Sequence, residues 1–153
     1  MKVVKPLSKI PTVGYRVFLA GSIEMGAAEN WQDKLTGLLS DTDGYILNPR
    51  RDDWDSSWEQ SIENAQFRNQ VCWELKAMEL ADRILMYFDP ATKSPISLLE
   101  LGMYCGSGKL VVCCPDGFWR KGNVDVVCER YHTPQVKTIE ELAQTLTPNE
   151  EPR

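Results

Sequence analysis

Apolar residues in this chain are grouped into short runs, which are separated by longer amphipathic segments. Runs rich in β-branched and aromatic residues predict strands, and they occupy residues 15–20, 45–47, 83–88 and 110–114. The last two runs are continuously apolar, which is typical of strands buried on both faces of a sheet. A further strand is predicted within residues 131–136. The pattern therefore predicts a buried sheet of about five strands.

Helical spacing dominates the segments between these runs. Trp31 and Leu35 recur at a helical interval and indicate an amphipathic helix. Ser56 and Glu59 have the spacing of a capping box, which predicts the start of a second helix. The predicted helical segments are 27–40, 56–80 (either continuous or broken near Asn64 or Asn69), 94–106, a helical turn within 118–128, and 139–146.

Strand and helix alternate throughout, which favours a parallel sheet with helices on both faces and right-handed crossovers. The sequence predicts an α/β fold, a flavodoxin-like or Rossmann-like three-layer sandwich. Its 153 residues fit a single domain over 1–153, with an N-terminal arm at 1–14 and a loose tail at 147–153. Ligands of such folds bind beyond the carboxyl ends of the strands. The loops expected at that edge are 21–26, 48–54, 89–97 and 115–123.

Glu100 is the most informative side chain of the predicted third helix. Ser94 suits the N-cap and Pro95 suits the first helical position, which places Glu100 about one turn inside, among leucines. A carboxylate there loses hydration, while the helix N-terminus helps to keep it ionised. Such a group suits nucleophilic catalysis. The alternative is a capping box with Ser97 as N-cap and Glu100 at N3, and the residues leave both interpretations open.

Glu74 interrupts an apolar stripe on the predicted second helix. Phe67, Val71 and Met78 share one face with it at helical spacing. One interpretation is a residue at the edge of the stripe whose carboxylate reaches solvent. The other is a second acid that faces the same cleft as Glu100.

Composition narrows the class of protein. A formal net charge of -5 argues against binding a nucleic-acid polymer. No apolar run is long enough to span a bilayer, and the first residues lack a signal-peptide core. Five cysteines without a C-x-x-C motif indicate a reduced, cytoplasmic protein. With a single histidine, His132, the sequence favours neither a zinc site nor a Ser-His-Asp triad, and no metal or organic cofactor is implied.

Several short motifs occur in a characteristic order. They are the strand and turn at 17–23, Asn48-Pro49-Arg50, Trp73-Glu74-Leu75, Ala81-Asp82 and Leu99-Glu100-Leu101-Gly102. Over about residues 15–125, this ordered set resembles the nucleoside 2-deoxyribosyltransferase superfamily, and in particular its "nucleoside 2-deoxyribosyltransferase-like" branch. It also resembles, more distantly, the 2′-deoxynucleoside 5′-phosphate N-hydrolases.

The resemblance implies a nucleophile at Glu100 and an acidic partner at Glu74. The family usually carries Asp at the second position, and its deoxyribosyltransferases often have Tyr and Asp where this chain has Phe18 and Ser94. The resemblance also implies a small-molecule nucleoside or nucleotide ligand and a homo-oligomer, at least a dimer. Neither a membrane nor a nucleic-acid polymer is expected as a partner.

The chemistry is coherent with these residue types. Cleaving an N-glycosidic bond builds positive charge on the anomeric carbon, which a nearby carboxylate stabilises or attacks. A second acid, Glu74, can orient Glu100 or protonate the departing base. Trp54, in its polar loop, either stacks on a base or packs against the protein. The candidate substrate contacts are Gly21, Ser22, Ile23 and Met25 on the sugar side and Asn48, Arg50, Asp53 and Trp54 on the base or phosphate side.

The sequence therefore predicts an enzyme that cleaves or transfers at the N-glycosidic bond of a nucleoside or nucleotide. One alternative is a hydrolase of 2′-deoxynucleoside 5′-monophosphates, in which water replaces the acceptor base. A second is a nucleotide-binding sensor without turnover, and a third is a flavin carrier. The turn at 21–23 lacks the G-x-G-x-x-G fingerprint of dinucleotide-binding folds. Its backbone amides suit a phosphate or a ribose hydroxyl, or it is a plain strand-to-helix turn.

Overall fold

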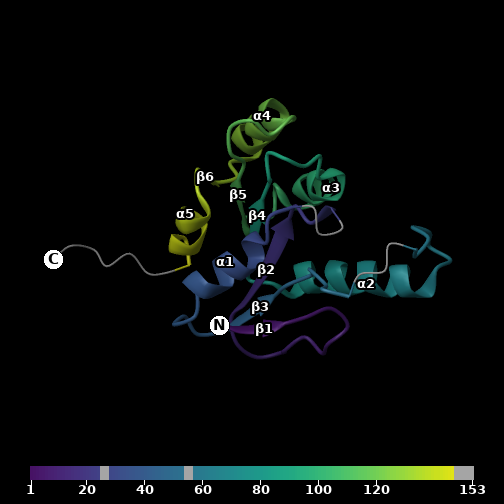
Figure 1. Cartoon of the computed structure of the whole chain (residues 1–153). Helices are drawn as coiled ribbons and strands as arrows, with labels where there is room; N and C mark the ends of the chain where they lie inside the picture. The colour runs from purple at the N-terminus through teal and green to yellow at the C-terminus, as the bar shows by residue number, and fades with distance from the viewer. Residues whose placement is uncertain (25–27, 54–56, 147–153) are drawn as a thin grey trace.

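The computed structural model describes residues 1–24, 28–53 and 57–146, and a six-stranded sheet forms its centre (Figure 1). The strand order is β1-β3-β2-β4-β5-β6, and each neighbouring pair is parallel. The predicted α/β fold is confirmed, with one strand more than expected. The strands are β1 (Lys2–Val4), β2 (Arg16–Gly21), β3 (Tyr45–Leu47), β4 (Arg83–Tyr87), β5 (Leu110–Cys113) and β6 (Gln135–Val136).

Helices cover both faces of the sheet, as the alternation of strands and helices requires (Figure 1). Successive side chains of a strand point to opposite faces, and β2 shows this clearly. Val17 packs in the core beneath α1 and α5, whereas Phe18 packs in the core beneath α2, α3 and α4. The helices are α1 (Trp31–Leu38), α2 (Ala65–Leu80), α3 (Pro95–Tyr104), α4 (Lys121–Tyr131) and α5 (Ile139–Gln144).

Element boundaries differ clearly from the predictions in four places. The helix predicted from Ser56 begins at Ala65, because Asn64 caps it by accepting the Phe67 N–H at 2.9 Å. Glu59 therefore lies outside α2, so its capping-box role is wrong, and Ser56 lies outside the described residues. Lys2–Val4, within the expected N-terminal arm, pairs with β3 as an edge strand.

The other two boundary differences concern the C-terminal part of the chain. Tyr131 ends α4 instead of starting a strand, and His132 stops that helix in a left-handed conformation with φ 55°. Only Gln135–Val136 of the predicted last strand pairs with β5. The predicted tail at 147–153 lies outside the described residues.

The carboxyl ends of β2 and β4, called the cleft edge below, form the topological switch point of the sheet. The chain leaves β2 toward β3 on one side, while β4 continues toward β5 on the other. In such sheets the loops diverge at this point and leave room for a ligand. Gly21 ends β2 with φ 140°, and a Cβ there would lie 2.2 Å from the Tyr87 carbonyl oxygen. Only glycine therefore allows β2 and β4 to approach so closely at the cleft edge.

Candidate functional site

Glu100 and Glu74 lie on neighbouring helices that cover the same face of the sheet. Glu100 belongs to α3 and is buried, with 8% of its surface exposed. Glu74 belongs to α2 and is half-buried. The charge of Glu74 acts on Glu100, so the two carboxyls form one electrostatic unit. Half-burial fits a residue at the edge of its stripe as well as an acid that faces the cleft, so both interpretations of Glu74 stay open.

The start of α3 tests the capping-box interpretation of Glu100. The helix begins at Pro95, which occupies the predicted first position. Ser97 is thus inside the helix and Glu100 lies in its second turn, so the capping-box alternative is wrong. Ser94 holds the N-cap position, but in a left-handed conformation and without a side-chain bond to the helix. The predicted capping by the Ser94 hydroxyl is therefore also wrong.

Burial raises the pKa of both carboxyls. It raises the pKa of Glu100 to about 8, and the nearby charge of Glu74 raises it as well. Burial likewise raises the pKa of Glu74 to about 7, against the opposing effect of a hydrogen bond from Gln70. The expected ionising effect of the helix N-terminus on Glu100 is wrong, because that effect fades after the first turn and desolvation exceeds it. Groups coupled in this way titrate as a pair.

A cluster of three buried hydroxyls joins the loops after β2 and β4. The Ser22 and Ser94 oxygens lie 2.5 Å apart, and Thr92 donates to Ser22 at 3.0 Å. Ser22 also accepts the Asp89 N–H at 2.8 Å. The Ser22 side chain is fully buried and holds the two loops together. Its predicted contact with a sugar remains a prediction.

Glu24 was not singled out by the sequence, yet it contacts the N-terminus of α3. Its Oε1 accepts the N–H groups of Lys93 and Ser94, each at 2.6 Å. Successive N–H groups ahead of a helix form an anion-binding arrangement, and here the chain supplies its own anion. Ile23 precedes Glu24 and is half-buried, whereas Met25 lies outside the described residues.

The loop after β3 holds the remaining sequence candidates. Asn48 is buried and accepts the Arg50 N–H at 3.0 Å. The Arg50 guanidinium donates to the carbonyls of Ala28 and Glu29, both at 3.1 Å. Arg50 thus fastens this loop to the segment before α1, and its predicted phosphate or base contact would compete with those bonds.

Asp53, in the same loop, forms an ion pair with Arg51 at 3.1 Å. The Arg51 guanidinium holds the pKa of Asp53 below its usual range. Trp54, the other candidate of this loop, lies outside the described residues. Arg51 also bonds to Gln70, which in turn bonds to Glu74. The sequence did not single out Gln70, because its contacts depend on how this loop folds against α2.

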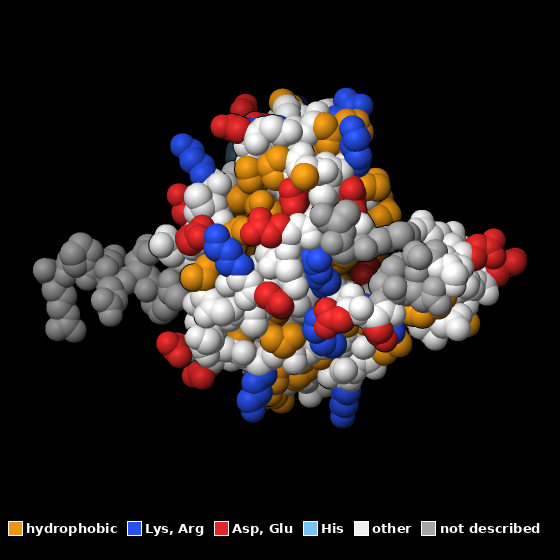
Figure 2. Space-filling model, in the orientation of Figure 1, with side chains coloured by type: hydrophobic (Ala, Val, Ile, Leu, Met, Phe, Trp, Pro, Cys, Tyr) orange, Lys and Arg blue, Asp and Glu red, His pale blue; other side chains and the backbone are white. Residues whose placement is uncertain are grey.

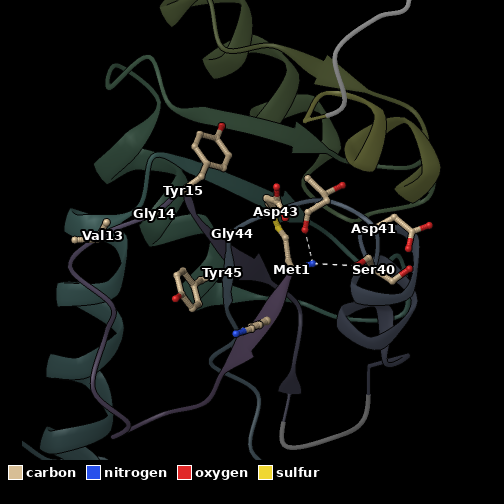
Figure 3. A pocket seen from close by; sticks show the side chains of 11 residues that line it. Met1, Val13, Gly14, Tyr15, Ser40, Asp41, Asp43, Gly44 and Tyr45 are labelled. Atoms are coloured by element: carbon tan, nitrogen blue, oxygen red, sulfur yellow. Dashed lines mark hydrogen bonds between the residues drawn. The ribbon is translucent and has the colours of Figure 1, made fainter.

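A hollow lies at the amino edge of the sheet, opposite the edge with the candidate residues (Figure 3). Its volume is about 570 Å³, and it is lined by the loops before β1, β2 and β3. The Met1 ammonium lies there and donates to the Leu39 carbonyl at 2.9 Å and the Thr42 carbonyl at 2.5 Å. None of the candidate residues lines this hollow. Its size therefore says nothing about the site at the carboxyl edge.

The wider surface adds little to the candidate chemistry. Figure 2 shows basic and acidic side chains mixed on the face drawn, without a broad basic area on that face. Within 1–24, 28–53 and 57–146, no three His, Cys, Asp or Glu side chains are grouped to hold a metal ion. In the same part of the chain no helix is long and apolar enough to cross a membrane.

The fold and the carboxyl pair define an α/β protein with two coupled acids on helices that cover one face of a parallel sheet. Comparison with known families identifies it further. Residues 14–118 match the nucleoside 2-deoxyribosyltransferase like family, and the chain belongs to that family. The matched range includes Glu74 and Glu100. No curated protein matches the chain. The family suggests an enzyme of glycosyl transfer that binds a small-molecule nucleoside.

Proposed function

We propose that this protein cleaves the N-glycosidic bond of a nucleoside and transfers the sugar, with Glu100 as nucleophile and Glu74 as proton donor. The observation that carries the proposal is the pair of coupled carboxyls on α2 and α3, both with raised pKa values. Two carboxyls whose environments raise their pKa toward neutrality suit acid and nucleophile roles at physiological pH. Membership of the family supports the substrate class.

The reaction follows from these two roles. A Glu100 carboxylate oxygen attacks the anomeric carbon, and the bond to the base nitrogen breaks with its electron pair going to that nitrogen. Glu74 gives the nitrogen its proton and becomes a carboxylate. The resulting glycosyl ester is then attacked by an acceptor base, whose proton returns to Glu74, and Glu100 is released. Two inversions give net retention at the anomeric carbon.

The pair must hold one proton for this cycle to begin. With both carboxyls protonated Glu100 is not a nucleophile, and with both ionised Glu74 has no proton to give. The singly protonated state is populated between the two macroscopic pKa values of the pair. Because the pKa of Glu100 is raised to about 8 and that of Glu74 only to about 7, the single proton rests mainly on Glu100 in the free protein, and the reactive form is the minor one in which Glu74 carries the proton. We therefore expect a bell-shaped pH profile centred above neutrality.

Glu24 supports an unphosphorylated nucleoside over a nucleoside 5′-monophosphate. Its carboxylate accepts the two N–H groups that precede α3, which also carries Glu100. A substrate phosphate that sought the same donors would have to displace a carboxylate and then lie beside it. We therefore rank the monophosphate hydrolase and the nucleotide sensor below the nucleoside transferase as candidate functions.

We propose a homo-oligomer, at least a dimer, as the working form. On α3, Ile96 and Leu99 each expose 61% of their surface and Met103 exposes 47%. Their spacing places them along one side of the helix, and an exposed apolar stripe of this kind often marks an interface. Light scattering of the wild type and of Leu99→Glu tests it, since the charged variant is expected to dissociate. A wild type that is monomeric with full activity would contradict it.

A cytoplasmic location is also proposed. All five cysteines are free thiols, and four of them are buried. Cysteines retained without disulfides are typical of a reducing compartment. Fractionation of the cells that make the protein tests the location, and recovery in an oxidising compartment would contradict it.

The decisive assay is incubation with a panel of nucleosides and their 5′-monophosphates, with and without an acceptor base, followed by chromatography of free base. Nucleoside turnover that depends on the acceptor supports the transferase. Glu100→Gln should abolish it, and Glu79→Gln, an exposed carboxyl on α2, is the matched control. Base release only from monophosphates in water would replace the proposal with the hydrolase. Tight binding without base release would favour the sensor.

A further inference from the structure

Gln70 connects the loop after β3 to the carboxyl of Glu74. It lies one helical turn before Glu74 on α2, and only 3% of its surface is exposed. Its Nε2 donates to Glu74 Oε1 at 2.8 Å and to the Pro49 carbonyl at 3.3 Å. Its Oε1 accepts from Arg51 Nη1 at 3.4 Å. Both ends of this buried amide are thus engaged.

These partners leave the Gln70 amide one orientation. A guanidinium can only donate, so the amide oxygen must face Arg51. The Pro49 carbonyl can only accept, so the NH₂ group must face Pro49 and, with it, Glu74. Arg51 is itself held by its ion pair with Asp53 at 3.1 Å, and its guanidinium lies 5.1 Å from the centre of the Trp58 ring. The orientation of the amide is therefore set by groups that cannot exchange donor for acceptor.

We propose that Gln70 is the positioning residue of Glu74, reserving Oε1 as a hydrogen-bond acceptor so that the carboxyl carries its proton on Oε2. An oxygen that bears a proton is the poorer acceptor, so a fixed N–H donor at Oε1 favours protonation of the other oxygen. Resting on the proposed function, this means that the leaving base receives its proton from one defined atom. Defined placement of an acid can contribute a large part of a rate enhancement.

The same contact predicts a direction for the titration of Glu74. A hydrogen bond donated to a carboxylate favours the ionised form, so Gln70 opposes the effect of burial. The charged groups to consider are Glu100, coupled from α3, and Arg51, which lies behind Gln70. Removing the Gln70 amide should therefore raise the pKa of Glu74, whereas a role confined to packing would leave it unchanged.

The test is a pH titration of the glutamate side-chain carboxyl carbons by ¹³C NMR in the whole chain, which needs no substrate. Gln70→Met keeps the length of the side chain and removes both polar groups. Gln66→Met, at an exposed position of the same helix, is the matched control. The midpoint of Glu74 should rise by about half a pH unit or more in Gln70→Met and stay unchanged in Gln66→Met. An unchanged midpoint in Gln70→Met would overturn the proposal.

Arg51→Met provides a second variant if Gln70→Met does not fold. Without Arg51 only the 3.3 Å bond to the Pro49 carbonyl holds the amide, so the amide turns its oxygen toward Glu74 in part of the molecules, where it accepts from the protonated carboxyl and again raises the pKa. An unchanged midpoint of Glu74 in this variant would also overturn the proposal. Where turnover is measurable, Gln70→Met should lower kcat about tenfold with little change in KM. A titration shift in a protein that releases no base would support the positioning role and refute the proposed function.

Discussion

Carboxyl groups at the two edges of the sheet lie in opposite electrostatic environments. At the carboxyl edge Glu100 is buried without a cation beside it, and its pKa is raised to about 8. At the amino edge Asp82 is partly exposed and forms an ion pair with Arg16 at 3.7 Å. The hollow of about 570 Å³ is at the amino edge. An unneutralised buried carboxyl costs stability, so its presence marks the functional edge better than the size of a hollow does.

Helix ends at both edges are met by a side chain of the favourable charge. At the amino edge Lys109 donates to the carbonyls of Met78 and Ala81 at the C-terminus of α2, at 2.6 and 3.1 Å. A cation at a helix C-terminus is a stabilising arrangement. At the carboxyl edge Glu24 meets the N-terminus of α3, also with the favourable sign. Among the described residues no ion pair involves Glu74 or Glu100, in contrast to these compensated helix ends.

The largest expected effect is a difference in turnover between variants at the two edges. Glu100→Gln should lower turnover at least about 1,000-fold, because an amide is a poor nucleophile. Asp82→Asn should leave turnover within about twofold, since the exposed pair at the amino edge contributes little. Initial rates of base release on folded proteins, verified by circular dichroism, measure both. Comparable losses in the two variants would remove the distinction between the edges.

The next largest expected effect is a difference in the pH dependence of stability between variants at the two edges. The pKa of Glu100 lies above its ordinary value of 4.5, so the folded state holds a proton that the unfolded chain releases. The free energy of unfolding should therefore fall as pH rises from about 4.5 to about 8. Glu100→Gln should be more stable than the wild type at pH 8.5, by on the order of 1–3 kcal/mol, and this gain should vanish near pH 4.

Urea unfolding at both pH values measures that difference. Asp82→Asn, whose wild-type carboxylate is paired, should show no gain at high pH. A wild type that is as stable as Glu100→Gln at pH 8.5 would mean that Glu100 is not held protonated by burial.

A smaller effect sharpens the description of the pair itself. The charge of Glu74 raises the pKa of Glu100, so Glu74→Gln should lower the ¹³C titration midpoint of Glu100. The carboxyl at the amino edge offers a control, because Asp82→Asn should leave that midpoint unchanged. If Glu74→Gln does not move the midpoint of Glu100, the two carboxyls are not coupled and cannot share one proton.

The smallest expected effect concerns the substrate. Glu24→Gln removes the negative charge from the N–H groups before α3 and should raise the kcat/KM ratio of a nucleoside 5′-monophosphate to its nucleoside about three- to tenfold. Glu29→Gln removes a carboxylate from the same segment without touching those donors. A ratio that rises equally in both variants would reflect net charge alone and would leave Glu24 without a role in selectivity.

Much of the framework was predictable, because it depends on local pattern. The runs at 83–88 and 110–114 are strongly apolar, and β4 and β5 lie within them. Pro95 marks the start of α3 correctly. The edge strand β1 was missed because three residues, Lys2–Val4, are too few to show a strand period. The start of α2 was misplaced because Ser56 and Asn64 are both good cap residues, and local sequence does not rank them.

The site was predictable in its residues but not in its contacts. An apolar helix that carries Glu100 identifies an unusual carboxyl from sequence alone. The Ser94 hydroxyl, by contrast, bonds Ser22 across 72 positions, so no local rule assigns it. Gln70 acquires its role only because the loop with Pro49 and Arg51 folds against α2. The pKa of Glu100 was misjudged because sequence shows the helix start but not the depth of burial.

The central claim is that Glu100 becomes covalently bonded to the sugar. A 2-fluoro-arabinosyl nucleoside destabilises the cationic transition states of both steps and should allow the glycosyl ester to accumulate. Intact-protein mass spectrometry should then show one added sugar in the wild type and none in Glu100→Gln, and peptide mapping should place it on Glu100. Rapid base release without any adduct, together with inversion at the anomeric carbon, would contradict the claim and assign Glu100 to activating water.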